Sequence, residues 1–346
     1  MRITRSWSIP VITAFGLAAC GQGEAPAEAT GEAGAPQAQS TAESAVPTYS
    51  AEAFFQTTSY RMVGSAGHAF SSDGSALLVS SDKTGVFNAY RLPVDGSEPT
   101  MLTDSDENAI FAVSWFPDDD RLLYTYDGGG NELNHVIVRE IDGSYRDLTP
   151  GDSLKAAFSG WSADNEGFYL LTTERNQTSF DLYRYSVSDY SRELVYENPG
   201  FQIGELSPDG RWLALDKPIS SADSDIYLVD LQSDDREPVL ITEHEGNIEH
   251  STMGFTADSG ALIFGTNEHG EYNQAWLHSI ESGEKSPYVV ADWDVRYAAS
   301  SRSGDYLVYG VNVDARTEVT LKDLRTDEPV ELPKLPAGEM RNVHFS

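Results

Sequence analysis

The sequence predicts an all-β fold, a β-propeller with six four-stranded blades followed by the first strand of a seventh. A small-residue turn recurs along the chain, and its central positions are separated by 45, 46, 45, 49 and 45 residues. A fixed period of about 40–50 residues with four short strands per repeat is typical of propeller blades. The central turn positions are held by Asp73, Asp118, Asp164, Asp209, Asp258 and Ser303.

Each turn is followed by runs rich in Leu, Val, Tyr and Phe, which suit strands buried between blades. Second strands are expected at Leu77–Ser81, Leu122–Tyr126, Phe168–Thr172, Trp212–Asp216, Leu262–Thr266 and Tyr306–Gly310. Third strands are expected at Phe87–Pro93, Leu133–Arg139, Phe180–Tyr185, Ile226–Asp230, Tyr272–His278 and Glu318–Asp323. A polar turn then leads to a short outer strand. In two repeats this turn is an Asp-Gly pair, Asp95-Gly96 and Asp142-Gly143, which favours a tight hairpin.

A further repeat begins at the end of the sequence. Asn342–Ser346 matches the innermost strand that precedes each turn, as in Gly204–Ser207. An unfinished repeat leaves a sheet edge uncovered, which natural proteins avoid. We therefore expect residues 53–346 to form a propeller that is incomplete at its C-terminus and belongs to a longer polypeptide. The alternative is a six-bladed protein with a short extended tail.

The first 52 residues predict export and a tether. Arg2 and Arg5 precede a short apolar core, Trp7–Ala18, as in a signal peptide. Leu17–Cys20 resembles the lipobox of bacterial lipoproteins, so residues 1–20 are interpreted as a lipoprotein signal peptide with Cys20 as the lipidated residue. An ordinary cleavable signal is the alternative. By the habit of that class, the following glycine favours the outer membrane, which predicts a periplasmic, lipid-anchored protein.

Residues 21–52 are a linker rich in Ala, Gly, Glu and Pro. Such a composition buries too little surface to offset its conformational entropy, so the segment is expected to be disordered. A short helix is expected at Ala51–Thr57. Because Cys20 is the only cysteine of the chain, no disulfide can form within the mature domain.

The net charge of −32 excludes some partners. Such an acidic surface repels nucleic acid and anionic lipid headgroups, so we expect no nucleic-acid partner and membrane contact only through the lipid anchor. It either attracts cations and basic peptides or simply hydrates an exported protein.

Motifs for catalysis or cofactor binding are missing from the sequence. No serine lies in a Gly-x-Ser-x-Gly elbow, and the seven histidines lack metal-ligand spacing. His244 and His250 are six residues apart, and Asp118–Asp120 lies in a repeated turn, so neither predicts a metal site. Gly128–Gly130 lacks the Lys-Ser/Thr of a phosphate loop. We expect no catalytic residue, no metal and no cofactor in this chain.

Several short sequence segments resemble those of known propellers. Ser207–Trp212 followed by Asp225–Asp230 looks like the Tol-type propeller repeat. Four further phrases are similar to the N-terminal propeller of bacterial peptidases of the prolyl oligopeptidase family: Ser80–Asn88, Gly129–His135, Phe180–Tyr185 and Tyr272–Trp276.

The second resemblance implies that the propeller precedes an α/β-hydrolase domain with a Ser-Asp-His triad, and that it gates access of short peptides. This chain ends before any such residues, so we expect it to be inactive alone while its parent is a serine peptidase. Relatives that trim dipeptides hold the substrate with paired glutamates, and no Glu-Glu pair occurs here. Oligopeptidase or acylaminoacyl-type specificity fits better. The alternative is a non-enzymatic, Tol-like lipoprotein that binds a protein or glycan partner.

Substrate-facing residues are expected in the polar loops between second and third strands, at 127–134, 174–179 and 266–271. Loops on a rigid scaffold are where binding residues accumulate. The candidates, for contact with a peptide or with an adjoining hydrolase domain, are Asn131, Glu132, Asn134, Arg175, Asn176, Glu268 and His269. Arg175 is the strongest, since a guanidinium fork can hold a carboxylate or carbonyls. The alternative is that these residues are only solvated connections.

Overall fold

The computed structural model describes residues 47–341, 343 and 345. The predicted signal peptide, Cys20 and most of the predicted linker lie outside the described residues. Two units divide the chain between Phe55 and Gln56. In the described part of the first, α1 (Ala51–Phe55) is shorter than the predicted helix, and none of its residues is buried. No helix in the described part of the chain is long and apolar enough to cross a membrane.

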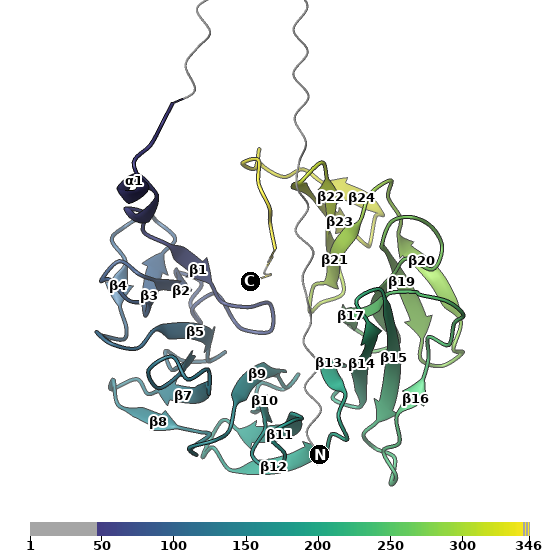
Figure 1. Ribbon diagram of the computed structural model, residues 1–346, viewed down its shortest axis with the longest axis horizontal. Helices are drawn as coiled ribbons and strands as arrows, with labels where there is room; N and C mark the ends of the chain where they lie inside the picture. The colour runs from purple at the N-terminus through teal and green to yellow at the C-terminus, as the bar shows by residue number, and fades with distance from the viewer. Residues whose placement is uncertain (1–46, 342, 344, 346) are drawn as a thin grey trace, which may run out of the picture. The chain divides into compact units, whose positions relative to one another are not determined.

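The second unit contains six four-stranded antiparallel sheets, each formed by four strands in chain order (Figure 1). Blade 1 comprises β1 (Tyr60–Met62), β2 (Ala76–Ser81), β3 (Asn88–Pro93) and β4 (Thr100–Met101). Blade 2 comprises β5 (Ile110–Trp115), β6 (Leu122–Tyr126), β7 (His135–Arg139) and β8 (Tyr145–Asp147). Blade 3 comprises β9 (Ala156–Trp161), β10 (Gly167–Thr172), β11 (Asp181–Ser186) and β12 (Arg192–Tyr196).

The second half of the ring repeats the pattern. Blade 4 comprises β13 (Gln202–Leu206), β14 (Trp212–Ser220), β15 (Asp223–Asp230) and β16 (Val239–Leu240). Blade 5 comprises β17 (His250–Phe255), β18 (Ala261–Thr266), β19 (Gln274–Ser279) and β20 (Lys285–Val289). Blade 6 comprises β21 (Val295–Ser300), β22 (Tyr306–Val313), β23 (Arg316–Asp323) and β24 (Glu328–Val330). The predicted all-β propeller with six four-stranded blades is confirmed.

The predicted second strands agree with the structure to within one residue at their starts. Two of them extend further than predicted, because β14 and β22 continue to pair with the following strand as far as Ser220↔Asp223 and Val313↔Arg316. The connection from second to third strand at these two places is therefore a tight hairpin.

The recurring turn is held by its own side chains. In blade 1, the hydroxyl of Ser71 donates to Asp73 Oδ1 at 2.6 Å, and the same oxygen accepts the backbone N–H of Ser75 at 3.0 Å. These bonds favour the ionised carboxylate, and they lower the pKa of Asp73. The next residue, Gly74, has φ of 69°, a conformation that glycine adopts without strain. The aspartate at the centre of this turn thus reflects hydrogen bonding within the turn.

The hydrophobic core is divided among the interfaces between neighbouring blades. One cluster joins each consecutive pair, from blades 1 and 2 to blades 5 and 6. Phe168 belongs to the cluster between blades 2 and 3 and is fully buried. Within the described residues, no comparable cluster joins blade 6 to blade 1, and Figure 1 shows the C-terminal segment entering the space between them.

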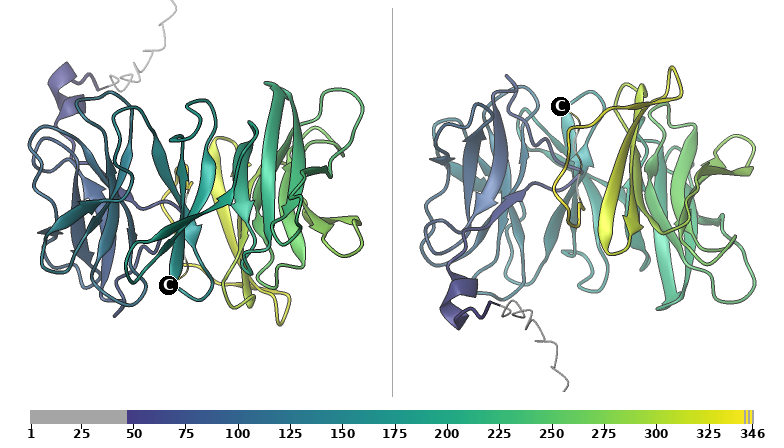
Figure 2. Two further views of the ribbon diagram at one scale, coloured as in Figure 1. Left: turned by 90° about the horizontal axis from the view of Figure 1, so that it is seen from below. Right: turned by 90° about the horizontal axis from the view of Figure 1, so that it is seen from above.

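The C-terminal segment follows the path of a blade-to-blade crossing. Elsewhere the residue entering an inner strand bonds to the start of the preceding third strand, as when Ile110 N–H donates to Phe87 C=O at 2.8 Å. In blade 6, Thr317 N–H donates to Gly338 C=O at 2.9 Å, and Met340 N–H donates to Thr317 Oγ1 at 3.0 Å. Figure 2 shows this segment running beside blade 6 from two sides.

The seventh inner strand itself stays a prediction. Val343 and Phe345 are described and belong to no strand, while residues 342, 344 and 346 lie outside the described part of the chain.

Candidate functional site

The loops that carry the predicted site residues lie next to the blade-to-blade crossings, and hydrogen bonds fix them there. Ala156 N–H, at the start of blade 3, donates to Asn134 C=O at 2.7 Å. In the same way, Val295 N–H, at the start of blade 6, donates to Asn273 C=O at 2.8 Å. Loops and crossings therefore make one face of the ring, which is supported by the sheets beneath it.

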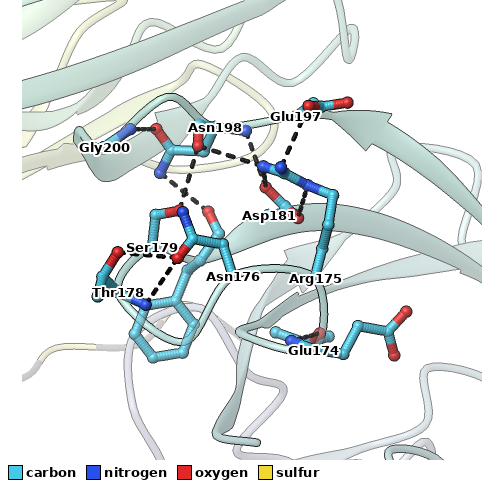
Figure 3. Close-up of polar contacts among 11 residues, drawn as sticks. Glu174, Arg175, Asn176, Thr178, Ser179, Asp181, Glu197, Asn198 and Gly200 are labelled. Atoms are coloured by element: carbon cyan, nitrogen blue, oxygen red, sulfur yellow. Dashed lines mark hydrogen bonds and ion pairs between the residues drawn. The ribbon is translucent and has the colours of Figure 1, made fainter.

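Arg175 lies in this face but is already engaged (Figure 3). Its Nε donates to Asp181 Oδ2 at 2.7 Å and its Nη2 to Asp181 Oδ1 at 2.9 Å, a bidentate pair. Its Nη1 lies 3.1 Å from a carboxylate oxygen of Glu197. The Asp181 side chain is fully buried, whereas that of Arg175 is 36% exposed. These contacts raise the pKa of Arg175, chiefly through the hydrogen bonds to Asp181.

The same carboxylate organises the crossing to blade 4. Asp181 Oδ1 also accepts the backbone N–H of Asn198 at 2.8 Å, and the fully buried Asn198 side chain donates to the C=O groups of Phe180 and Phe201 at 2.9 and 2.8 Å. Arg175 neutralises the buried acid on which this network depends. Its guanidinium therefore stabilises the loop and the crossing to blade 4. Contact of Arg175 with a peptide remains a prediction.

The other predicted residues are arranged as turn residues. Asn176 Oδ1 accepts the N–H and the hydroxyl of Thr178 at 3.1 and 2.8 Å. Asn131 Oδ1 accepts Leu133 N–H at 2.9 Å, and Glu132 has φ of 60°. The side chains of Asn131 and Glu132 are exposed.

In blade 5, the His269 ring lies 3.9 Å from the Trp276 ring, measured between centroids, and 4.0 Å from the carboxylate of Glu268. The three loops occupy equivalent places in blades 2, 3 and 5. Among the described residues, no hydrogen bond, ion pair or ring contact joins one loop to another. A shared substrate surface formed by them therefore stays a prediction.

A cavity lined by charged residues of both signs lies elsewhere. It has a volume of about 630 Å³ and is lined by inner strands and turns of blades 3 to 6 together with Ser65 and Ala66, which precede the turn of blade 1. Residues from so many blades meet only near the ring axis, so we call it the axial cavity. Glu205 and Arg302 line it, and the sequence analysis named neither of them.

Glu205 lies beside a second acid, Asp216. Desolvation by the surrounding protein atoms raises the pKa of Glu205 to about 7, and the negative charge of Asp216 raises it further. Burial also raises the pKa of Asp216, although Thr252 donates to both of its oxygens at 3.1 and 2.8 Å. Among the described residues, the Glu205 carboxylate has no hydrogen-bond or ion-pair partner. It is exposed to the solvent of the axial cavity.

A buried histidine pair lies between blades 4 and 5. His244 donates through Nδ1 to Thr242 C=O at 2.8 Å and contacts Asp223 at 3.1 Å through Nε2, which is the pattern of a charged ring. Its pKa is raised, chiefly by the bond to Thr242. The His250 ring lies 5.0 Å away, and neither of its nitrogens has a hydrogen-bond partner among the described residues. No group of three or more His, Cys, Asp or Glu within the described residues could hold a metal.

His250 predicts a loss of stability in acid. Burial, followed by the charge of His244, lowers the pKa of His250 to about 4 from an ordinary value of 6.5. Between these values the unfolded chain binds a proton that the folded chain rejects, so stability falls as the pH drops from about 6.5 towards 4. His250→Leu should flatten this part of the profile in urea unfolding measured across pH. Exposed Arg316→Gln is the control and should leave the profile unchanged; equal slopes for wild type and His250→Leu would contradict the prediction.

Comparison with known proteins places this geometry in a family. The prolyl oligopeptidase N-terminal β-propeller domain matches residues 99–341, which is more than half of the chain. The chain belongs to this family. The resemblance seen in the sequence is thereby confirmed.

The chain is also similar to one curated relative and to several solved structures. Dipeptidyl aminopeptidase BIII of Pseudoxanthomonas mexicana is 28% identical over 140 residues, which cover 40% of this chain and 20% of that protein. A solved prolyl endopeptidase structure superposes with a TM-score of 0.60 at 14% identity, covering 82% of this chain and 44% of that one. An oligogalacturonate lyase in complex with manganese also gives a TM-score of 0.60 at 14% identity, covering 79% and 77%.

At 14% identity the two structures show a shared fold alone. The chain spans a fifth of the dipeptidyl aminopeptidase and less than half of the prolyl endopeptidase. The preference for oligopeptidase over dipeptidyl-peptidase specificity stays a prediction.

Proposed function

We propose that this chain is the substrate-gating propeller portion of an exported serine peptidase of the prolyl oligopeptidase family that acts on short peptides. The observation that carries the proposal is the family match over residues 99–341. In the proposal, the catalytic serine, aspartate and histidine belong to an α/β-hydrolase domain that follows the propeller in a longer parent polypeptide.

The ring supports a gating role on physical grounds. From blades 1 and 2 to blades 5 and 6, neighbouring sheets pack through hydrophobic clusters, so a folded protein could pass between these blades only by breaking an interface. A short, flexible peptide needs no such opening. A hydrolase domain set over the ring would be shielded from bulk water and from large substrates.

Export is proposed from the sequence pattern of the first 20 residues, with Cys20 as the lipid attachment site. The acidic composition is compatible with a hydrated surface outside the cytoplasm. Metabolic labelling with a fatty-acid analogue tests this step. Label should be incorporated by the wild type and lost in Cys20→Ser; equal labelling of both would contradict it.

The division of labour between propeller and hydrolase is tested by a fluorophosphonate probe. Because no nucleophile–base pair was found in this sequence, the purified 346-residue chain should not be labelled and should not hydrolyse peptide or ester reporters. The parent polypeptide should be labelled at one serine outside these residues. Stoichiometric labelling within the 346 residues, or an unlabelled and inactive parent, would overturn the proposed function.

A further inference from the structure

Six structurally equivalent turns allow the repeats to be compared position by position. In each turn, one backbone N–H donates to the C=O five residues later, at 2.8 to 2.9 Å. The donors are Ser71, Phe116, Ser162, Ser207, Thr256 and Ser301. This shared bond aligns the blades without reference to any other protein.

Glu205 departs from the repeat at the inner strand. It lies two residues before the donor, and the five equivalent positions hold small, uncharged residues: Ala69, Ser114, Gly160, Gly254 and Ala299. A carboxylate therefore occurs at this place in blade 4 alone.

Arg302 departs from the repeat in the turn itself. It directly follows the donor, where the other blades have Ser72, Pro117, Ala163, Pro208 and Ala257. The next position, aspartate in those five turns, is Ser303, and its hydroxyl lies 3.2 Å from that of Ser301. The turn of blade 6 therefore has an additional positive charge at Arg302, and at the next position Ser303 replaces the aspartate of the other five turns.

The Arg302 side chain reaches across the ring. Its Nη1 donates to Asn165 Oδ1 in the turn of blade 3 at 3.2 Å, and its Nη2 lies 3.3 Å from Nε2 of His68. Asn165 is uncharged, and no carboxylate of the described residues lies within ion-pair distance of Arg302. Partial burial lowers the pKa of Arg302. The guanidinium is thus held in the axial cavity without a counter-ion, with N–H groups to spare.

We propose that the axial cavity binds short peptides as zwitterions, with Arg302 holding the free C-terminal carboxylate and Glu205 the free ammonium group. Both side chains line the same cavity and have opposite charges, and among the described residues neither has an ion-pair partner. The volume of about 630 Å³ lies within the range of small-ligand sites. Trp161, Tyr169 and Phe255 supply apolar wall for peptide side chains. The identification of the ligand as a peptide rests on the proposed function. The pair of opposite charges in the cavity is observed independently of that function.

Calorimetric titration of the 346-residue chain with three forms of trialanine tests the site. The forms are the free peptide, its C-terminal amide and its N-acetyl derivative. We expect the free peptide to bind at least about tenfold more tightly than either blocked form, because each blocked form loses one charge-assisted contact. Arg302→Gln should abolish the preference for the free carboxylate but keep that for the free amine. Glu205→Gln should do the reverse.

Control variants separate binding from folding. Arg316→Gln removes an exposed arginine of the same blade and should bind like the wild type. Arg302→Lys keeps the charge and should retain part of the carboxylate preference. Unchanged melting temperatures for Arg302→Gln and Glu205→Gln would assign their effects to the site.

Equal affinity for the three trialanine forms, or loss of preference in Arg316→Gln as well, would overturn the proposal. The readout needs no catalysis, so it is distinct from the fluorophosphonate test of the parent. If the axial cavity distinguishes the three trialanine forms but the fluorophosphonate probe never labels the parent, the proposed binding site stands and the proposed peptidase function is wrong.

Discussion

Phe168→Ala is expected to lower the free energy of unfolding by about 3–5 kcal/mol, the usual cost of truncating a buried phenylalanine. Phe168 is fully buried and stacks on Tyr185, with ring centroids 5.5 Å apart and planes inclined by 15°. Its ring also lies 5.4 Å from Trp161 and 6.0 Å from Phe116, so it packs against side chains of blades 2 and 3. The cavity left by alanine would open at an interface whose residues cannot collapse independently.

Urea unfolding followed by tryptophan fluorescence measures this loss. Tyr145→Ala provides the control, because Tyr145 is also aromatic but is 76% exposed on the outer strand β8. We expect that variant to change stability by less than about 0.5 kcal/mol. A Phe168→Ala chain as stable as Tyr145→Ala would mean that the blade interface does not carry the stability assigned to it.

Arg175→Ala is expected to lower the melting temperature of the chain by several degrees, although Arg175 was predicted as a surface contact for substrate. The substitution leaves the fully buried Asp181 carboxylate without its bidentate partner. Removing one member of such a pair leaves an uncompensated buried charge, and this lowers the free energy of unfolding more than the loss of an exposed ion pair does. The crossing at Asn198 depends on the same carboxylate and should loosen with it.

Calorimetry of three variants distinguishes this scaffold role from a role in binding. Arg316→Ala, which removes an exposed arginine 3.3 Å from Glu318, should leave the melting temperature nearly unchanged. The double variant Arg175→Ala with Asp181→Ala should be more stable than the sum of the two single losses predicts. A melting temperature of Arg175→Ala equal to that of Arg316→Ala would return Arg175 to the candidates for substrate contact alone.

The sequence alone determined the blade count, the strand order and the family. These properties depend on local chemistry that recurs with a fixed period: a turn with aspartate at its centre in five of six repeats closes on itself, in blade 1 through hydrogen bonds between residues two apart. Apolar runs of five or six residues then fix which strand is buried. Prediction was weakest where strands continue past the polar residues, as in β14, because hairpin pairing there overrides side-chain polarity.

Only the tertiary structure decided which of the charged residues form ion pairs within the described part of the chain. Arg175 and Arg302 are both arginines in polar segments, and nothing local separates them. Arg175 meets Asp181, six residues later, because the loop folds back onto β11. Arg302 meets Asn165 from a blade on another side of the ring, 137 residues away in sequence. The closing of the sheets around a common axis sets these distances, so the axial cavity with Glu205 and Arg302 emerges only when the blades are assembled.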